Sequence, residues 1–185
     1  MLRREVLDAI DGAPMLQAPD DVYGMSEGVS AVKVATIEDL GRLLTEVSTE
    51  MNLSPYWADS TRGHERRHAQ AALQLGASEI DFRLHFTRYP SADTPEGILQ
   101  VGAATLIQFR EPQPPLTLAL IASYPNPSKG DSMFVSQLGY QDVDEVADIA
   151  RRLNKNFGFD YPIPSWARAV DWTPDQTRNP ANIDL

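Results

Sequence analysis

The chain has 185 residues, of which 42% are hydrophobic and 23% are charged, proportions typical of a globular protein that buries its own core. Its 16 basic and 26 acidic residues give a formal net charge of −10, and so acidic a surface disfavours phosphate backbones and anionic lipids as partners. Cysteine is absent, which excludes disulfides, thiol nucleophiles and cysteine-bound metals, so a metal site would have to use histidine and carboxylate ligands.

The N-terminal segment predicts one short helix, at residues 2–11, followed by a loop rich in Gly, Pro and Asp. It has no apolar run of the kind found in secretory signals. The longest apolar stretch of the chain, residues 116–122, is too short to span a bilayer. We therefore expect a cytoplasmic protein with no membrane or nucleic-acid partner.

A strand and a helix are expected next. Residues 29–35, VSAVKVA, predict a short edge strand. In the following segment, residues 36–52, Thr36 stands three residues before Asp39, as in a capping box, and apolar residues recur at helical spacing. This segment is predicted to be an amphipathic helix.

The middle of the chain predicts a second helix and two strands. The helix is expected over about residues 61–75, because Gly76 follows at the position where glycine commonly ends a helix. Within residues 78–89, apolar and polar side chains then alternate from Glu79 to Thr87, which predicts a strand with one buried face. Its apolar face consists of Ile80, Phe82, Leu84 and Phe86. Residues 97–109 predict a further, longer strand.

Two more strands and a helix are expected towards the C-terminus. Residues 116–124, LTLALIASY, are apolar on both faces of an extended chain and are interpreted as a central strand. A turn at PNPSKGD and a fourth strand at residues 132–138, SMFVSQL, are expected to follow. The last predicted element is a helix that begins after Asp142 and ends near Gly158.

These elements predict an α+β fold, with an antiparallel sheet of about four meandering strands and helices packed on one face. Residues 29–158 would form the core domain. Residues 1–28 would be a helix and loop extension, and residues 159–185 a C-terminal arm that contains several Pro and Trp residues.

The sharpest functional signal is HERRH at residues 64–68, within the second predicted helix. Residues i and i+4 lie one above the other on a helix, so the imidazoles of His64 and His68 could bind one zinc ion. The intervening Glu65 would then act as the general base towards a metal-bound water. This motif resembles that of the zincin metallopeptidases; the resemblance covers these five residues and implies a zinc-dependent hydrolase.

A site of this kind needs a third protein ligand. The third histidine of the chain, His85, lies on the polar face of the following strand and could complete a three-histidine site if the helix covers that face. Glu79 and Asp81, on the same face, are alternatives. The apolar face is the more natural one for a helix to cover, and packing on that face would leave His85 on the far side of the sheet.

A second interpretation is that His64 and His68 are partly buried structural histidines at the rim of the core. Arg66 and Arg67 stand where zincins usually have uncharged residues, which favours this interpretation. No nucleotide-binding glycine pattern is present, so zinc is the only cofactor indicated.

If no metal is bound, the protein is expected to be a non-catalytic protein that binds a partner or a small ligand through its sheet or its aromatic arm. Tyr161, Trp166 and Trp172 are the candidate contacts in this arm, because aromatic side chains bury a large area with few torsions. They would either pack back on their own domain or contact a protein partner or a second copy of the chain, giving a homodimer.

Overall fold

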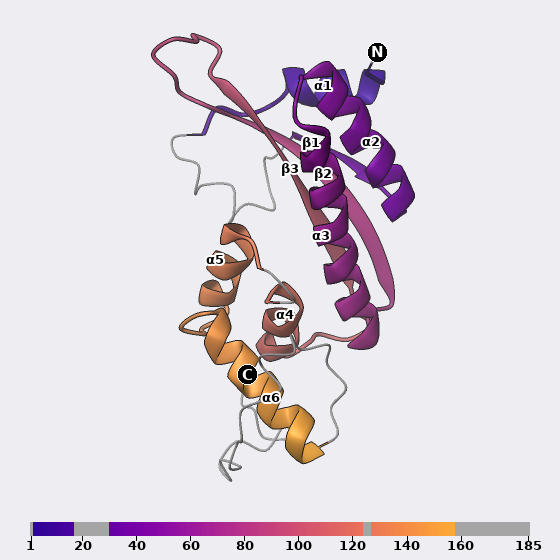
Figure 1. Ribbon diagram of the computed structural model, residues 1–185, viewed down its shortest axis with the longest axis vertical. Helices are drawn as coiled ribbons and strands as arrows, with labels where there is room; N and C mark the ends of the chain where they lie inside the picture. Colours follow the sequence, from indigo (N-terminus) through magenta and orange to yellow (C-terminus); the bar gives the residue numbers. More distant parts are fainter. Residues whose placement is uncertain (1, 17–29, 124–126, 158–185) are drawn as a thin grey trace. The chain divides into compact units, whose positions relative to one another are not determined.

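The computed structural model describes residues 2–16, 30–123 and 127–157 (Figure 1). These residues form two compact units. The first unit contains the described residues up to Ala69 together with Glu79–Gln108, and the second contains residues 70–78 and the described chain from Phe109 onward. One boundary, between Ala69 and Gln70, falls inside a continuous helix, so this helix contributes residues to both units.

The first unit is built around a sheet and three helices. In chain order its elements are α1 (Arg4–Asp11), β1 (Ser30–Val34), α2 (Ile37–Glu50), α3 (Pro55–Gln74), β2 (Glu79–Tyr89) and β3 (Ile98–Gln108). The sequence predicts all six. The predicted N-cap of α2 is confirmed, because the side chain of Thr36 accepts a hydrogen bond from the backbone N–H of Asp39 (3.1 Å). Helix α3 starts earlier than expected, since the N–H of Trp57 already donates to the carbonyl of Ser54 (2.9 Å).

The three strands form an antiparallel sheet in the order β1-β2-β3. Residues paired across neighbouring strands lie on the same face, so Val32 shares a face with Leu84, and Phe82 shares it with Thr105. This apolar face is buried, as the alternation predicts: Phe82, Leu84 and Phe86 are 4%, 0% and 0% exposed. The opposite face is also covered in places, since Asp81 and Thr87 on it are buried.

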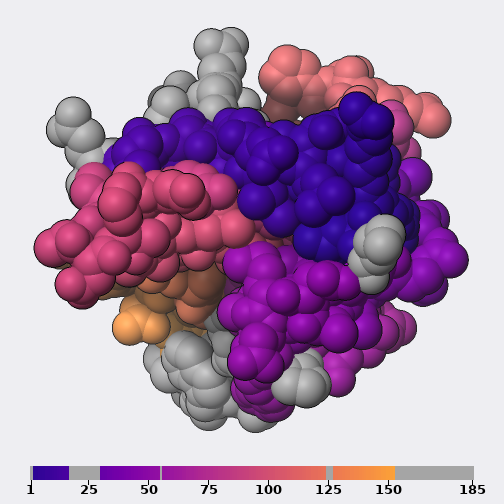
Figure 2. Space-filling view, turned by 90° about the horizontal axis from the view of Figure 1, so that it is seen from above, coloured from indigo at the N-terminus to yellow at the C-terminus, as the bar shows by residue number. Residues whose placement is uncertain are grey.

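Helices α1, α2 and α3 cover this apolar face, where they complete one hydrophobic core (Figure 1). Their contributions to the core are Val6 and Ala9 from α1, Leu40, Leu43, Leu44 and Val47 from α2, and Ala58 and Ala69 from α3. Helix α1 contacts β1 and β2, and the space-filling view shows the indigo N-terminal residues on the surface of the molecule (Figure 2). Within the described residues the predicted α+β class is therefore confirmed.

The second unit is helical, and here two sequence predictions are wrong. Its elements after β3 are α4 (Pro115–Ala122), α5 (Lys129–Gln137) and α6 (Val143–Phe157), and α4 packs against both α5 and α6. The segments at 116–124 and 132–138, expected to be strands, lie largely in α4 and α5. The sheet in the described part of the chain accordingly has three strands rather than about four.

Local chemistry explains both corrections. A short run that is apolar on every side fits a buried helix as well as a buried strand, and Pro115 begins α4 at a position where proline is favoured. At α5, the side chain of Ser128 accepts from the N–H of Asp131, and the Asp131 carboxylate accepts from the N–H of Ser128. This capping box starts a helix inside the segment PNPSKGD, which had been expected to be a turn. Among the described residues, no helix is long and apolar enough to cross a membrane.

Candidate metal centre

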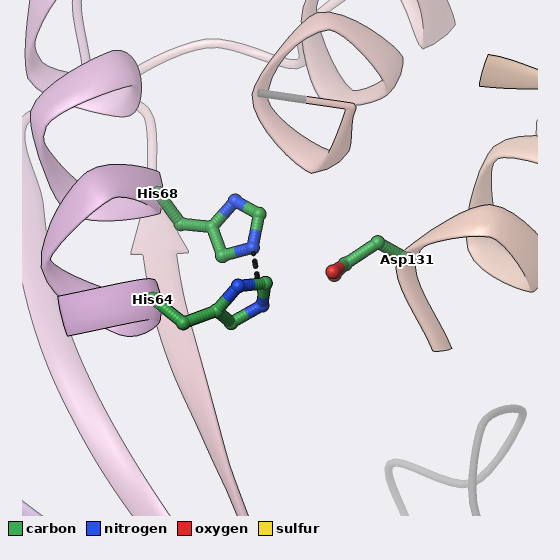
Figure 3. A group of neighbouring side chains, drawn as sticks. All are labelled: His64, His68 and Asp131. Carbon is green, nitrogen blue, oxygen red and sulfur yellow. Dashed lines mark hydrogen bonds between the residues drawn. The ribbon is translucent and has the colours of Figure 1, made fainter. Parts of the chain in front are cut away.

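His64 and His68 lie one turn apart on α3, and their imidazoles converge (Figure 3). The two Nε2 atoms are 2.9 Å apart and share a hydrogen bond. The rings meet edge to face, with centroids 4.4 Å apart and an interplanar angle of 88°. His68 is 5% exposed and His64 is partly exposed. The predicted i, i+4 convergence is therefore present in the structure.

The geometry of this pair is close to what a shared metal ion requires. Two nitrogen ligands at about 2.0–2.1 Å from a tetrahedral zinc ion lie roughly 3.3 Å apart, so the imidazoles of His64 and His68 would need to separate by only a few tenths of an ångström. In the hydrogen-bonded pair one Nε2 donates and the other accepts. A metal ion would bind the lone pairs of both Nε2 atoms, so the hydrogen that the two atoms share would have to leave them.

Glu65, the acidic residue of HERRH, is directed towards the sheet. It is 4% exposed, and the hydroxyl of Thr105 on β3 contacts both its carboxylate Oε2 (2.8 Å) and its backbone carbonyl oxygen (3.0 Å). Thr105 is a residue that the sequence analysis missed, because its partner lies 40 positions away and no local pattern marks it. The contact ties α3 to the apolar face of the sheet.

Helix α3 therefore has two buried stripes. Ala58, Glu65 and Ala69 form the stripe that meets the sheet. The helical spacing of the sequence predicts an inward stripe that contains His64, His68, Ala71 and Ala72 and points at the sheet, whereas the hydrogen bonds from α3 to the sheet are made by Glu65. His68 is nevertheless buried, as are Ala71 and Ala72 in the part of α3 that belongs to the second unit.

The structure does not bring His85 to the histidine pair. Phe82 lies on the face that α3 covers, so His85, three residues later in the same strand, lies on the opposite face. Glu79 and Asp81 share the face of His85 for the same reason, and Asp81 is engaged there by Lys33, with Nζ and Oδ2 2.5 Å apart. These residues could complete the site only if α3 covered the polar face of the sheet. Helix α3 covers the apolar face instead.

His85 is instead packed tightly within its own face of the sheet. Its imidazole lies directly over Gly102 of β3, where the Cβ of any other residue would overlap the ring. Its Nδ1 has no hydrogen-bond partner in the described part of the chain. Burial, and after it the positive charge of Arg83, lowers the pKa of His85 from 6.5 to about 4, so His85 is neutral at pH 7.

This depressed pKa predicts a loss of stability in mild acid. The unfolded chain takes up a proton at His85 near pH 6.5 whereas the folded protein does so only near pH 4, so the free energy of unfolding should fall as the pH drops through this window, by up to roughly 3 kcal/mol. Urea unfolding at pH 7, 5.5 and 4.5 measures the effect. The variant His85→Gln cannot titrate and should show a shallower pH dependence; equal slopes for the two proteins would contradict the prediction.

Asp131 is a further residue of a metal-ligating type, and Figure 3 draws it with the histidine pair. It belongs to α5 in the second unit. Its Oδ2 accepts hydrogen bonds from the N–H (2.7 Å) and the hydroxyl (2.6 Å) of Ser128, which hold the carboxylate at the N-terminus of the helix. The sequence analysis missed it, although the spacing of Ser128 and Asp131 is itself a capping-box signal.

The aromatic arm predicted as a partner contact, with Tyr161, Trp166 and Trp172, lies outside the described residues. Comparison of the chain with protein-family models, curated proteins and solved structures finds no match.

Proposed function

We propose that the protein binds a divalent transition-metal ion such as zinc through His64 and His68. The observation that carries the proposal is the convergence of the two Nε2 atoms, 2.9 Å apart on one helix face. Imidazole nitrogens are ligands that suit zinc.

The spacing of the two histidines also favours catalysis over a purely structural role. Two histidines at positions i and i+4 of a helix are the arrangement with which HExxH metallohydrolases bind zinc. A metal held in this way lowers the pKa of its water ligand and supplies a nucleophile at neutral pH. We therefore propose a metal-dependent hydrolase as the reaction class.

The role of Glu65 in such a reaction differs from the one that HERRH suggests. A general base must reach the proton that it removes, directly or through one water. The carboxylate of Glu65 is buried and contacts the hydroxyl of Thr105. This contact supports a role for Glu65 in holding α3 on the sheet, and its role as a general base remains a prediction.

Metal analysis tests the proposal. Protein purified without a histidine tag and reconstituted with zinc should contain about one ion per chain. Well-folded wild-type protein that takes up no zinc would overturn the proposal.

A further inference from the structure

Helix α3 packs on the core of the first unit through apolar side chains and through the hydrogen bonding between Glu65 and Thr105. Ala58 and Ala69 are small and buried, Trp57 packs against the same core, and apolar contact has no preferred direction. Such contacts set how closely α3 approaches the sheet but leave its rotation about its own axis weakly defined. The hydroxyl of Thr105 is different, because it contacts both the backbone carbonyl and the carboxylate of Glu65, at 3.0 Å and 2.8 Å.

The rotation of α3 decides where the two histidines point. An α-helix turns by about 100° per residue. His64 precedes Glu65 by one residue and His68 follows it by three, so both imidazoles leave the helix on the same side of Glu65, about 60–100° around the axis. Fixing Glu65 against β3 thereby fixes the direction of both Nε2 atoms.

We propose that Thr105 is the positioning residue of the metal site: its hydroxyl, acting through Glu65, sets the rotation of α3 that aims His64 and His68 at a common ion. This inference rests on the proposed metal binding. Thr105 contacts no ligand atom of the site, and its role is that of an outer partner, of the kind whose removal typically weakens metal affinity 10–100-fold.

Three variants of the full-length chain test this role. Thr105→Val removes the hydroxyl and keeps the branched shape, and Thr105→Ser restores a hydroxyl at the same position. Thr87→Val is the matched control, because Thr87 is also a buried strand threonine, 1% exposed, but lies on the opposite face of the sheet, where its hydroxyl contacts the hydroxyl of Tyr89 (3.5 Å). Zinc affinity is measured by competition with a chelator, and cobalt(II) is used as a spectroscopic probe of the coordination geometry.

We expect Thr105→Val to bind zinc about 10–100-fold more weakly than the wild type and to give an altered visible cobalt spectrum. Thr105→Ser and Thr87→Val should match the wild type in both measurements. Circular dichroism checks that each variant is folded. If Thr105→Val does not fold, the zinc affinity and cobalt spectrum of Thr105→Ala are measured in its place.

The outcomes separate this inference from the proposed function. If the wild type binds neither ion, metal binding itself is wrong. If the wild type binds and folded Thr105→Val binds equally well with the same cobalt spectrum, Thr105 does not position the site although the site exists. If Thr105→Ser is as impaired as Thr105→Val, the hydroxyl is not the feature that matters, which also overturns the inference.

Discussion

Replacing His64 by alanine should remove zinc from the protein, with an affinity loss of more than about 100-fold, beyond that expected for a residue that only supports a ligand. His64 and His68 contribute one lone pair each from Nε2 atoms that lie 2.9 Å apart, so a single remaining imidazole can no longer chelate an ion on this face of α3. Elemental analysis of untagged protein after dialysis against zinc measures the loss. His68→Ala should show the same result, because the two ligands act as a pair.

The third histidine supplies the control for this experiment. His85 lies on the opposite face of the sheet from α3, so His85→Gln should retain the zinc content of the wild type when both are measured at pH 7, where His85 is already neutral. Zinc retained by His64→Ala, or lost equally from His85→Gln, would mean that the metal is bound elsewhere in the chain.

The first unit could be predicted almost entirely from the sequence because its signals are local and agree with one another. Strict alternation from Ile80 to Phe86 defines both the strand and its buried face, and the Thr36 cap marks the start of α2. The second unit could not be predicted as well. Residues 116–122 are apolar all around, so no periodicity distinguishes a buried helix from a central strand, and only the preceding prolines favour the helix.

The candidate site was predicted in part for a similar reason. The pairing of His64 with His68 depends only on helix geometry, which the sequence determines locally. The direction in which the two imidazoles point depends on Glu65. A charged residue such as Glu65 is expected on the surface when elements are predicted from apolar periodicity, but in the structure Glu65 is buried, with 4% of it exposed. A buried acid that faces a sheet can be recognised only when its partner is known, and Thr105 is 40 residues away.

Replacing Phe82 by alanine should lower the free energy of unfolding by about 3–5 kcal/mol, the usual range when a buried aromatic side chain is truncated. Phe82 is 4% exposed and belongs to the core shared by β2 and the helices that cover it. It lies opposite Val34 on one neighbouring strand and Thr105 on the other, so the surrounding backbone is held by hydrogen bonds on both sides and can collapse only partly into the cavity.

Arg83→Ala is the control for this truncation, because Arg83 is the next residue of the same strand and points to the opposite, polar face. Its side chain is only partly buried, and its loss should change the free energy of unfolding by no more than about 1 kcal/mol. Urea denaturation at pH 7 measures both variants. A larger loss in the free energy of unfolding for Arg83→Ala than for Phe82→Ala would mean that the assigned faces of β2 are reversed. Helix α3 would then cover the face that carries His85, and His85 would again be a candidate ligand beside His64 and His68.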